Sequence, residues 1–213
     1  MSRYLRPDRV CIQWLLVTVC RLLTGIRATW LAPPLPHQPT IYYANHSSHL
    51  DGLVIWASLP PEIRRRVHPV AAADYWLKTP LRRYLASSIF NAVLVERHGK
   101  SRDDAPRDPL EPLAGALERG ESLIFFPEGT RGDGETPGEF KSGLYHLAQR
   151  CPTAVLTPVW LENLNRVLPK GSRLVVPVIC RATFGESVAH PDEDETKKDF
   201  LLRARTALEN LSS

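Results

Sequence analysis

The sequence predicts an α/β domain with a mostly parallel central sheet covered by helices. Two observations predict this fold class. Short apolar runs alternate with segments of helical spacing along the 213-residue chain, and the apolar runs are continuous. Strands that are buried on both faces have such continuous apolar runs, which is typical of parallel sheets between helix layers. The length fits one domain with a single core.

The expected elements follow one another from residue 41 onward. A helix is expected to begin near Ser47, with Ser47 or Ser48 as its cap, and to end before Leu59-Pro60-Pro61. A second helix is expected to open on a capping box, Asp108-Pro109-Leu110-Glu111, and to end at Gly120. The remaining expected elements are strands at 41–44, 67–73, 92–95, 123–126, 154–159 and 174–178, and helices at about 141–149 and 197–211.

The N-terminal segment is apolar and basic. The run Val10–Cys20 lies between two arginines and is shorter than the roughly 20 residues of a membrane-spanning helix. Five arginines and one aspartate give residues 1–31 a net charge of +4, equal to that of the whole chain. We therefore expect an amphipathic helix in a membrane interface, with Trp14 and Trp30 at headgroup level; the alternative is a helix packed on the domain.

The prolines at 33, 34, 36 and 39 predict an extended linker. The sequence thus divides into a membrane-associating segment, 1–32, and a domain, 40–213. The four cysteines form no CxxC pair and no zinc-ligand spacing, so we expect reduced thiols and a place on the cytoplasmic face of the membrane. No known nucleic-acid-binding motif accompanies the basic patch, so nucleic acid is not an expected partner.

One histidine follows the first strand of the domain in Asn45-His46-Ser47-Ser48-His49-Leu50-Asp51. If His46 lies in the turn and Asp51 in the first helical turn, Asp51 can accept a hydrogen bond from one imidazole nitrogen and leave the other basic. Such a pair suits deprotonation of a substrate hydroxyl. Two other readings stay open at this point: a structural histidine, and a metal-dependent hydrolase that uses His46, His49 and Asp51.

Four blocks in order resemble the glycerolipid acyltransferase family, which includes the glycerol-3-phosphate and 1-acylglycerol-3-phosphate acyltransferases. The first block is NHxxxxD, and the third, FPEGTR, is complete. Where the second block opens with glycine in the family, Asn91 stands here, and Glu96 stands where aspartate is common. The matching segments are Asn45-His46 with Asp51, Asn91–Arg97, Phe126–Arg131, Val155–Val159, and Phe140–Gly143 after the third block.

The resemblance implies acyl transfer from acyl-CoA or acyl-carrier protein to the hydroxyl of a phosphate-bearing lipid precursor, with 1-acylglycerol-3-phosphate as the expected acceptor, in phospholipid biosynthesis. It implies His46 as general base and Asp51 as the residue that orients it, with no metal and no cofactor. The residues expected to bind the acceptor and its phosphate are Arg97, Glu128, Gly129, Thr130 and Arg131. The expected partners are the membrane lipid surface, the acyl donor and lysophospholipids.

Glycerol 3-phosphate and a lyso-aminolipid stay open as acceptors. A lipid-binding module without activity on the same fold is the alternative from a different functional class.

Overall fold

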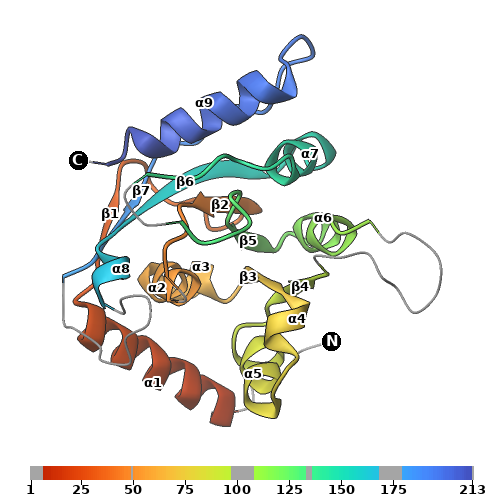
Figure 1. The fold of residues 1–213 in the computed structure, drawn as a ribbon. Coiled ribbons are helices and arrows are strands. Elements are labelled where there is room, and N and C mark those ends of the chain that lie inside the picture. Colours follow the sequence, from red (N-terminus) through yellow and green to blue (C-terminus); the bar gives the residue numbers. More distant parts are fainter. Residues whose placement is uncertain (1–6, 49, 97–107, 133–135, 168–178, 213) are drawn as a thin grey trace.

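A computed structural model describes residues 7–48, 50–96, 108–132, 136–167 and 179–212. Its centre is a seven-stranded sheet of order β1-β7-β6-β2-β5-β3-β4 (Figure 1). The inner strands consist mainly of apolar side chains buried between two helix layers, as the continuous apolar runs predicted. The strands are β1 Arg27–Trp30, β2 Thr40–Ala44, β3 Val67–Ala72, β4 Val93–Val95, β5 Ser122–Phe125, β6 Val155–Glu162 and β7 Arg181–Phe184.

The sheet is mostly parallel, which confirms the predicted fold class. β2 pairs in parallel with both β5 and β6, and β3 pairs in parallel with β4 and β5. The exception is β7, which runs antiparallel to β6 and carries β1 in parallel at the edge. The carboxyl ends of β2, β5, β3 and β4 therefore open at one edge of the sheet, where α/β proteins place their sites.

Helices cover both faces of the sheet (Figure 1). One hydrophobic cluster lies between the sheet and α1 and α2, and a second lies between the sheet and α6, α7 and α9. The helices are α1 Pro7–Thr24, α2 Asp51–Ser58, α3 Pro61–Arg64, α4 Ala73–Trp76, α5 Pro80–Tyr84, the π-helical turn η1 Leu85–Ile89, α6 Glu111–Glu118, α7 Gly143–Arg150, α8 Leu164–Val167 and α9 Lys197–Glu209.

Two predicted helix starts are wrong by a few residues. The first domain helix begins at Asp51 rather than near Ser47, and no serine side chain caps it. The second begins at Glu111, where Asp108 accepts a hydrogen bond from the Leu110 N–H (2.9 Å) and Glu111 pairs with Arg150. In both places a short polar side chain forms a turn just before the helix. The same residue types also cap helices, so the residue type alone does not show which of the two it does.

The edge of the sheet departs from the predicted pattern. β1 and β7 were not predicted, because four-residue strands with exposed positions give little apolar signal. β1 pairs with β7 from Arg27↔Arg181 to Trp30↔Phe184, so the end of the N-terminal segment is part of the domain's sheet. The predicted strand 174–178 lies outside the described residues.

The N-terminal helix packs on the domain through one face. Val17 and Cys20 are buried in the core, and Arg21 donates hydrogen bonds to the Ala57 carbonyl in α2 (2.9 and 3.2 Å). Among the residues that the structure describes, no helix is long and apolar enough to cross a membrane. The remaining surface of α1 exposes large apolar side chains: Val10, Trp14, Leu15, Val19, Leu22 and Leu23.

Candidate active site

The candidate residues meet at the carboxyl edge of the sheet. His46 follows β2 and Glu128 follows β5, and these strands are neighbours with Tyr43 opposite Phe125. The loop after β5 returns to the end of β2, where the Gly132 N–H donates to the His46 carbonyl (2.8 Å). Two blocks that are about 80 residues apart in sequence therefore form one site, as expected for the carboxyl ends of adjacent parallel strands.

His46 and Asp51 are hydrogen bonded, as the sequence predicted. The distance from His46 Nδ1 to Asp51 Oδ2 is 2.9 Å. The two residues meet because His46 lies in the turn before the helix and Asp51 is the first residue of α2. The side chain of Asp51 is fully buried, whereas that of His46 is 20% exposed, so the imidazole is open to a substrate.

The hydrogen bonds of Asp51 define the tautomer of the imidazole. Asp51 Oδ2 also accepts the backbone N–H groups of Ser47 (2.6 Å) and Ser48 (2.8 Å). Asp51 Oδ2 is thus a carboxylate oxygen that accepts hydrogen bonds from two amides. It accepts from Nδ1 as well, so Nδ1 carries the hydrogen. In neutral His46 the other nitrogen, Nε2, is then the basic atom. This is the arrangement of a general base with its orienting carboxylate.

The plane of the imidazole is held by an aromatic contact. The rings of His46 and Phe126 stack with centroids 4.3 Å apart and planes at 23°. Phe126 directly follows β5 and is the first residue of the FPEGTR block. The block thus supports the base from a second strand, a contact that the sequence did not predict.

The hydrogen-bond partners of Glu128 differ from the acceptor contact that the sequence predicted for it. Its Oε1 accepts the His46 backbone N–H (2.8 Å) and its Oε2 accepts the Gly138 N–H (2.9 Å). The residue is buried at 5% exposure, and both oxygens are engaged with the backbone. The sequence predicted Glu128 as an acceptor-binding residue. It instead links the His46 turn to the loop after β5.

Gly129 lies in a turn that a side chain would strain. Its φ is +70°, in the left-handed region that favours glycine. A Cβ atom at this position would lie 3.0 Å from Lys141 Nζ and 3.1 Å from Lys141 Cδ. The Lys141 side chain therefore lies against the Gly129 turn, and its backbone N–H donates to the Pro127 carbonyl (2.9 Å). Lys141 is therefore a cation at this edge of the sheet.

The predicted phosphate-binding residues are only partly described. Thr130 and Arg131 are exposed in the loop after β5. Arg131 directly precedes Gly132, whose N–H is bonded to the His46 carbonyl, so the arginine emerges from the chain beside the base. Arg97 lies outside the described residues. The structure thus places Thr130, Arg131 and Lys141 at the site edge and does not place Arg97.

Asn45 joins two strands below the base. Its side-chain amide donates to the Leu161 carbonyl (3.0 Å), and its oxygen accepts the Leu161 N–H (2.8 Å). These bonds connect the end of β2 to β6, so the asparagine of the NHxxxxD block has a structural use here. It fixes the strand end from which His46 emerges.

Metal ligation was the alternative for the first block. Within the part of the chain that the structure describes, no three His, Cys, Asp or Glu side chains gather as metal ligands. His49, the third member of the alternative set, lies outside the described residues. His46 Nδ1 and Asp51 Oδ2 are bonded to each other instead.

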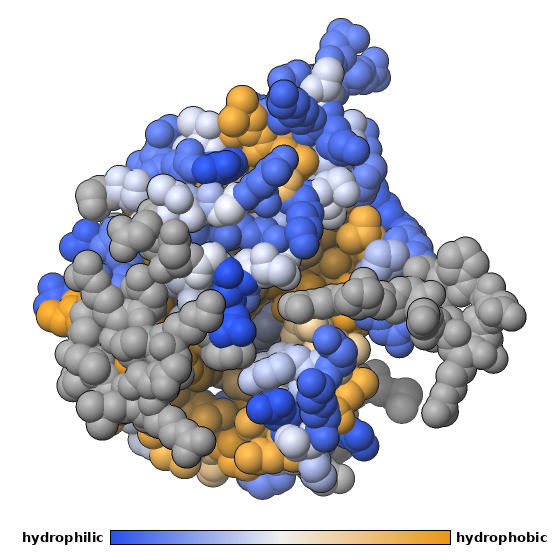
Figure 2. Space-filling view, viewed as in Figure 1, coloured by the Kyte–Doolittle hydropathy of each residue, from blue (hydrophilic) through white to orange (hydrophobic). Residues whose placement is uncertain are grey.

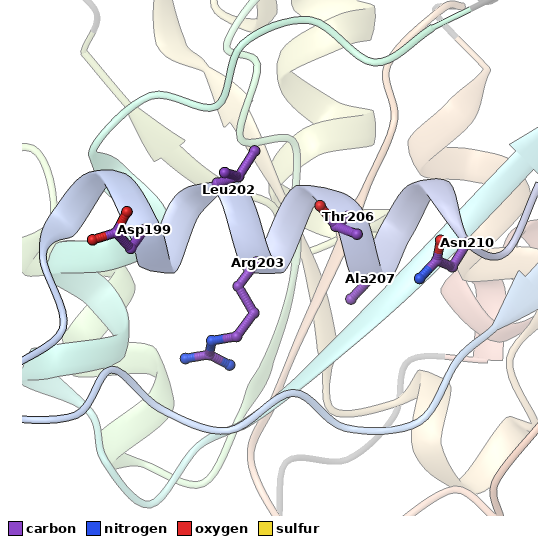
Figure 3. A pocket seen from close by; sticks show the side chains of 6 residues that line it. All are labelled: Asp199, Leu202, Arg203, Thr206, Ala207 and Asn210. Atoms are coloured by element: carbon purple, nitrogen blue, oxygen red, sulfur yellow. The ribbon is translucent and has the colours of Figure 1, made fainter.

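A solvent-open hollow lies away from this site, on α9. Figure 3 shows its lining side chains along the outer side of the helix. α9 belongs to the helix layer on the far side of the sheet from α2 and Asp51 (Figure 1). We assign no function to this hollow, which is lined by Asp199, Leu202, Arg203, Thr206, Ala207 and Asn210.

Curated relatives match about two thirds of the chain. A chloroplastic 1-acyl-sn-glycerol-3-phosphate acyltransferase of Brassica napus is 34% identical over 144 residues, which are 65% of this chain and 37% of the relative. A lyso-ornithine lipid O-acyltransferase of Pseudomonas aeruginosa is 31% identical over 144 residues, 67% of this chain and 50% of the relative. The chain spans between about a third and about a half of the length of the curated relatives it matches.

The fold has a counterpart among solved structures. The 1-acyl-sn-glycerophosphate acyltransferase PlsC of Thermotoga maritima superposes with a TM-score of 0.68 at 18% identity, covering 99% of this chain and 83% of that one. The sequence model of the Acyltransferase family matches residues 31–162, which include the His46, Asp51 and Glu128 positions. This match covers more than half of the chain, and the chain therefore belongs to the Acyltransferase family.

Proposed function

We propose that this chain transfers a fatty acyl group from a thioester donor, acyl-CoA or acyl-carrier protein, to the hydroxyl of 1-acylglycerol 3-phosphate. The observation that carries the proposal is the His46–Asp51 pair, which leaves Nε2 as the basic atom of a side chain that is 20% exposed. Among the described residues no serine or cysteine nucleophile is hydrogen bonded to His46, so the substrate hydroxyl is the group that the base serves.

The residues support a direct transfer. His46 Nε2 takes the proton of the acceptor hydroxyl while its oxygen attacks the thioester carbonyl carbon, which gives a tetrahedral intermediate. The carbon–sulfur bond then breaks, and the proton passes from the imidazolium to the leaving thiolate. Asp51 holds the tautomer and stabilises the imidazolium during these steps. One ester forms, one thioester is lost, and no covalent acyl-enzyme is required.

The acceptor phosphate is assigned to the cations beside the base. Arg131 and Lys141 both belong to the loop region after β5, and guanidinium and ammonium groups are the usual protein donors to phosphate oxygens. Arg97, at the end of the second block, is the third proposed ligand from the resemblance. We assign no phosphate contact to Glu128, since each of its oxygens accepts a backbone N–H and the carboxylate would repel a phosphate.

The names of the relatives support a lysophospholipid acceptor. Those from Arabidopsis thaliana, Brassica napus and Mycoplasma pneumoniae are named as 1-acyl-sn-glycerol-3-phosphate acyltransferases, the last of them as probable. The Pseudomonas aeruginosa relative is named as a lyso-ornithine lipid O-acyltransferase. Lyso-ornithine lipid is therefore the second candidate acceptor.

We place the reaction on the cytoplasmic face of a membrane, with α1 in the lipid interface. Its exposed face carries Trp14 and leucines where a helix of a water-soluble domain carries polar groups. The exposed Cys11 thiol on the same helix is a group that persists in a reducing compartment.

The test is an acyl-transfer assay with the purified chain. Labelled acyl-CoA and acyl-carrier protein are offered with lysophosphatidate, glycerol 3-phosphate and lyso-ornithine lipid in detergent micelles. His46→Ala is compared with His146→Ala, a histidine exposed on α7. Transfer that is lost only in His46→Ala supports the reaction and its base, and the preferred acceptor selects between the two candidates. Equal transfer in all three proteins, or none in any, contradicts the proposal.

A further inference from the structure

A second group of exposed apolar side chains lies beside α1. Leu77, Leu81 and Tyr84 are all exposed in the segment that contains α4 and α5, and Leu81 is 67% exposed. The most exposed apolar residues of α1 have similar values, with Trp14 at 69% and Leu22 at 77%. Figure 2 shows hydrophobic surface along the lower edge of the molecule, over α1, and a mixture of hydrophobic and hydrophilic surface over α5.

The two groups belong to one rigid unit. Gln13 Nε2 in α1 donates to the Ile89 carbonyl at the end of η1 (2.7 Å), and η1 continues directly from α5. Phe90, which follows η1, packs edge-on against both Trp56 of α2 and Trp76 of α4. α1 and the α4–α5 segment are therefore fixed relative to each other and to the helix that carries Asp51.

The α4–α5 segment lies at the same edge of the sheet as the base. β3 ends at Ala72, and α4 begins at the next residue. β3 pairs in parallel with β5, and β5 pairs in parallel with β2, so the carboxyl end of β3 opens on the side where His46 and Glu128 lie. The α4–α5 segment therefore leaves the sheet at the edge where His46 and Glu128 lie.

The charge around these side chains is positive. Between residues 74 and 84 the chain carries Lys78, Arg82 and Arg83 against Asp74. Lys78 and Arg83 are exposed, and the Arg82 guanidinium lies 4.2 Å from the centre of the Tyr75 ring. Apolar side chains that stand among basic ones match the interface of an anionic bilayer, where the chains enter the acyl boundary and the cations meet phosphates.

We propose that the α4–α5 segment is a second membrane-docking element, which acts with α1 to hold the active-site edge against an anionic lipid surface. Leu77, Leu81 and Tyr84 enter the lipid interface, while Lys78 and Arg83 bind headgroup phosphates. The proposal rests on the proposed function in that a lipid acceptor then reaches His46 from the bilayer without leaving it. Two contact elements also define the orientation of the domain, which one helix cannot do.

The test compares binding of the full chain to vesicles of phosphatidylcholine alone and of phosphatidylcholine mixed in equal parts with phosphatidylglycerol. Leu81→Asp is expected to lower partitioning into both kinds of vesicle, by about tenfold on the anionic ones. The variant loses a leucine side chain that inserts into the lipid and gains a negative charge. The double variant Lys78→Ala/Arg83→Ala is expected to bind anionic vesicles about tenfold more weakly and to bind phosphatidylcholine vesicles normally.

The matched control is Leu202→Asp on α9. Leu202 has a similar exposure, 59%, and lies in the opposite helix layer. It is expected to bind both kinds of vesicle like the unmodified chain. Thermal unfolding of each variant checks that the fold is retained, and acyl transfer to lysophosphatidate in detergent micelles checks that the site is intact.

The outcomes separate this proposal from the proposed function. Weaker vesicle binding by Leu81→Asp with normal transfer in micelles supports the second docking element. Unchanged vesicle binding by Leu81→Asp, beside a loss in Trp14→Asp, overturns it and leaves α1 as the docking element. A sedimentation coefficient that falls from dimer to monomer in Leu81→Asp also overturns it, because the face then belongs to a second copy of the chain. Absence of transfer in micelles by the unmodified chain contradicts the proposed function and not the docking element.

Discussion

Glu128 Oε1 accepts the backbone N–H of His46 at 2.8 Å, although 82 residues separate the two in sequence. The other carboxylate oxygen accepts the Gly138 N–H at 2.9 Å, and the Gly132 N–H returns a bond to the His46 carbonyl. His46, the proposed general base, is thus held by its backbone through the FPEGTR loop, while Asp51 holds its side chain. The two blocks of the family pattern form one structural unit.

Glu128→Gln is expected to lower kcat while leaving KM for the acceptor nearly unchanged. A glutamine side chain has one acceptor oxygen, so its NH₂ group faces one of the two backbone N–H groups that the carboxylate now accepts. Loss of one charge-assisted hydrogen bond, worth about 1.5–3 kcal/mol, corresponds to a decrease of about 10- to 100-fold in kcat if the base is displaced. Steady-state kinetics with varied lysophosphatidate measures both constants.

Glu139→Gln is the control for this change, since Glu139 is an exposed glutamate that follows Gly138 in the same loop. Its kinetics are expected to match those of the unmodified chain. A strong rise in KM with constant kcat in Glu128→Gln would show that Glu128 binds the acceptor, as the sequence had led us to expect.

Asp51→Asn is expected to retain the fold and to lose activity by a factor on the order of 10³–10⁴. The asparagine presents either an NH₂ group toward Nδ1, which reverses the tautomer and leaves Nε2 protonated, or an oxygen without the charge that stabilises the imidazolium. Single-turnover transfer measures the loss, and Asp192→Asn, at an exposed position before α9, is the control. A loss below tenfold would show that Asp51 only completes the turn before α2.

The parts of the site that a local pattern encodes were predictable from the sequence. The His46–Asp51 contact follows from a strand end and a helix start five residues apart, and the loop at Gly129 follows from the glycine itself. The use of Glu128 was not predictable, because its partners are backbone amides, which leave no mark on the residue types around them. Strands β1 and β7 were missed because their sequences, Arg-Ala-Thr-Trp and Arg-Ala-Thr-Phe, are short and contain no continuous apolar run.

His68 is expected to make folding stability sensitive to pH. Burial lowers the pKa of His68, and attraction by Glu121, 3.8 Å away, opposes this only in part. The unfolded chain, with a histidine pKa of about 6.5, therefore binds a proton at a higher pH than the folded chain does. Stability is then full above about pH 6.5 and falls as the pH decreases toward the lowered pKa of the folded state.

Urea unfolding of His68→Gln at about pH 7.5 and about pH 5.5 measures this effect. The variant is expected to lose less stability between the two pH values than the unmodified chain, although it is less stable at the higher one. His146→Gln, at an exposed position on α7, is expected to keep the full dependence. An equal dependence in all three proteins would exclude His68 as its source.

Asn91 accounts for one departure from the family pattern. Its φ is +46°, in the left-handed region that glycine adopts freely and that asparagine tolerates better than most residues. Asn91→Gly is therefore expected to change the free energy of unfolding by less than about 0.5 kcal/mol, and Asn91→Ala to reduce it by about 1–2 kcal/mol. Asn210→Ala is the control, because Asn210 has φ −64°. A loss in Asn91→Gly equal to that in Asn91→Ala would show that the asparagine side chain, not its backbone conformation, is what the site needs.

Cys11 offers a direct measure of how α1 meets lipid. It is exposed on α1, whereas Cys20, Cys151 and Cys180 are buried, and burial raises the pKa of Cys20 and of Cys180 to about 11. An environment-sensitive maleimide is therefore expected to label the folded chain once, at Cys11, and Cys11→Ser to prevent labelling.

The emission of the attached probe is expected to shift to the blue when anionic vesicles are added, because Cys11 lies on the exposed side of the helix beside Trp14 and Leu15. High salt is expected to reverse the shift, since the arginines of the segment act through screened charge. A probe that stays in water while the protein pellets with vesicles would place α1 away from the bilayer. The membrane contact would then fall to the α4–α5 segment alone, and the exposed leucines of α1 would need another partner.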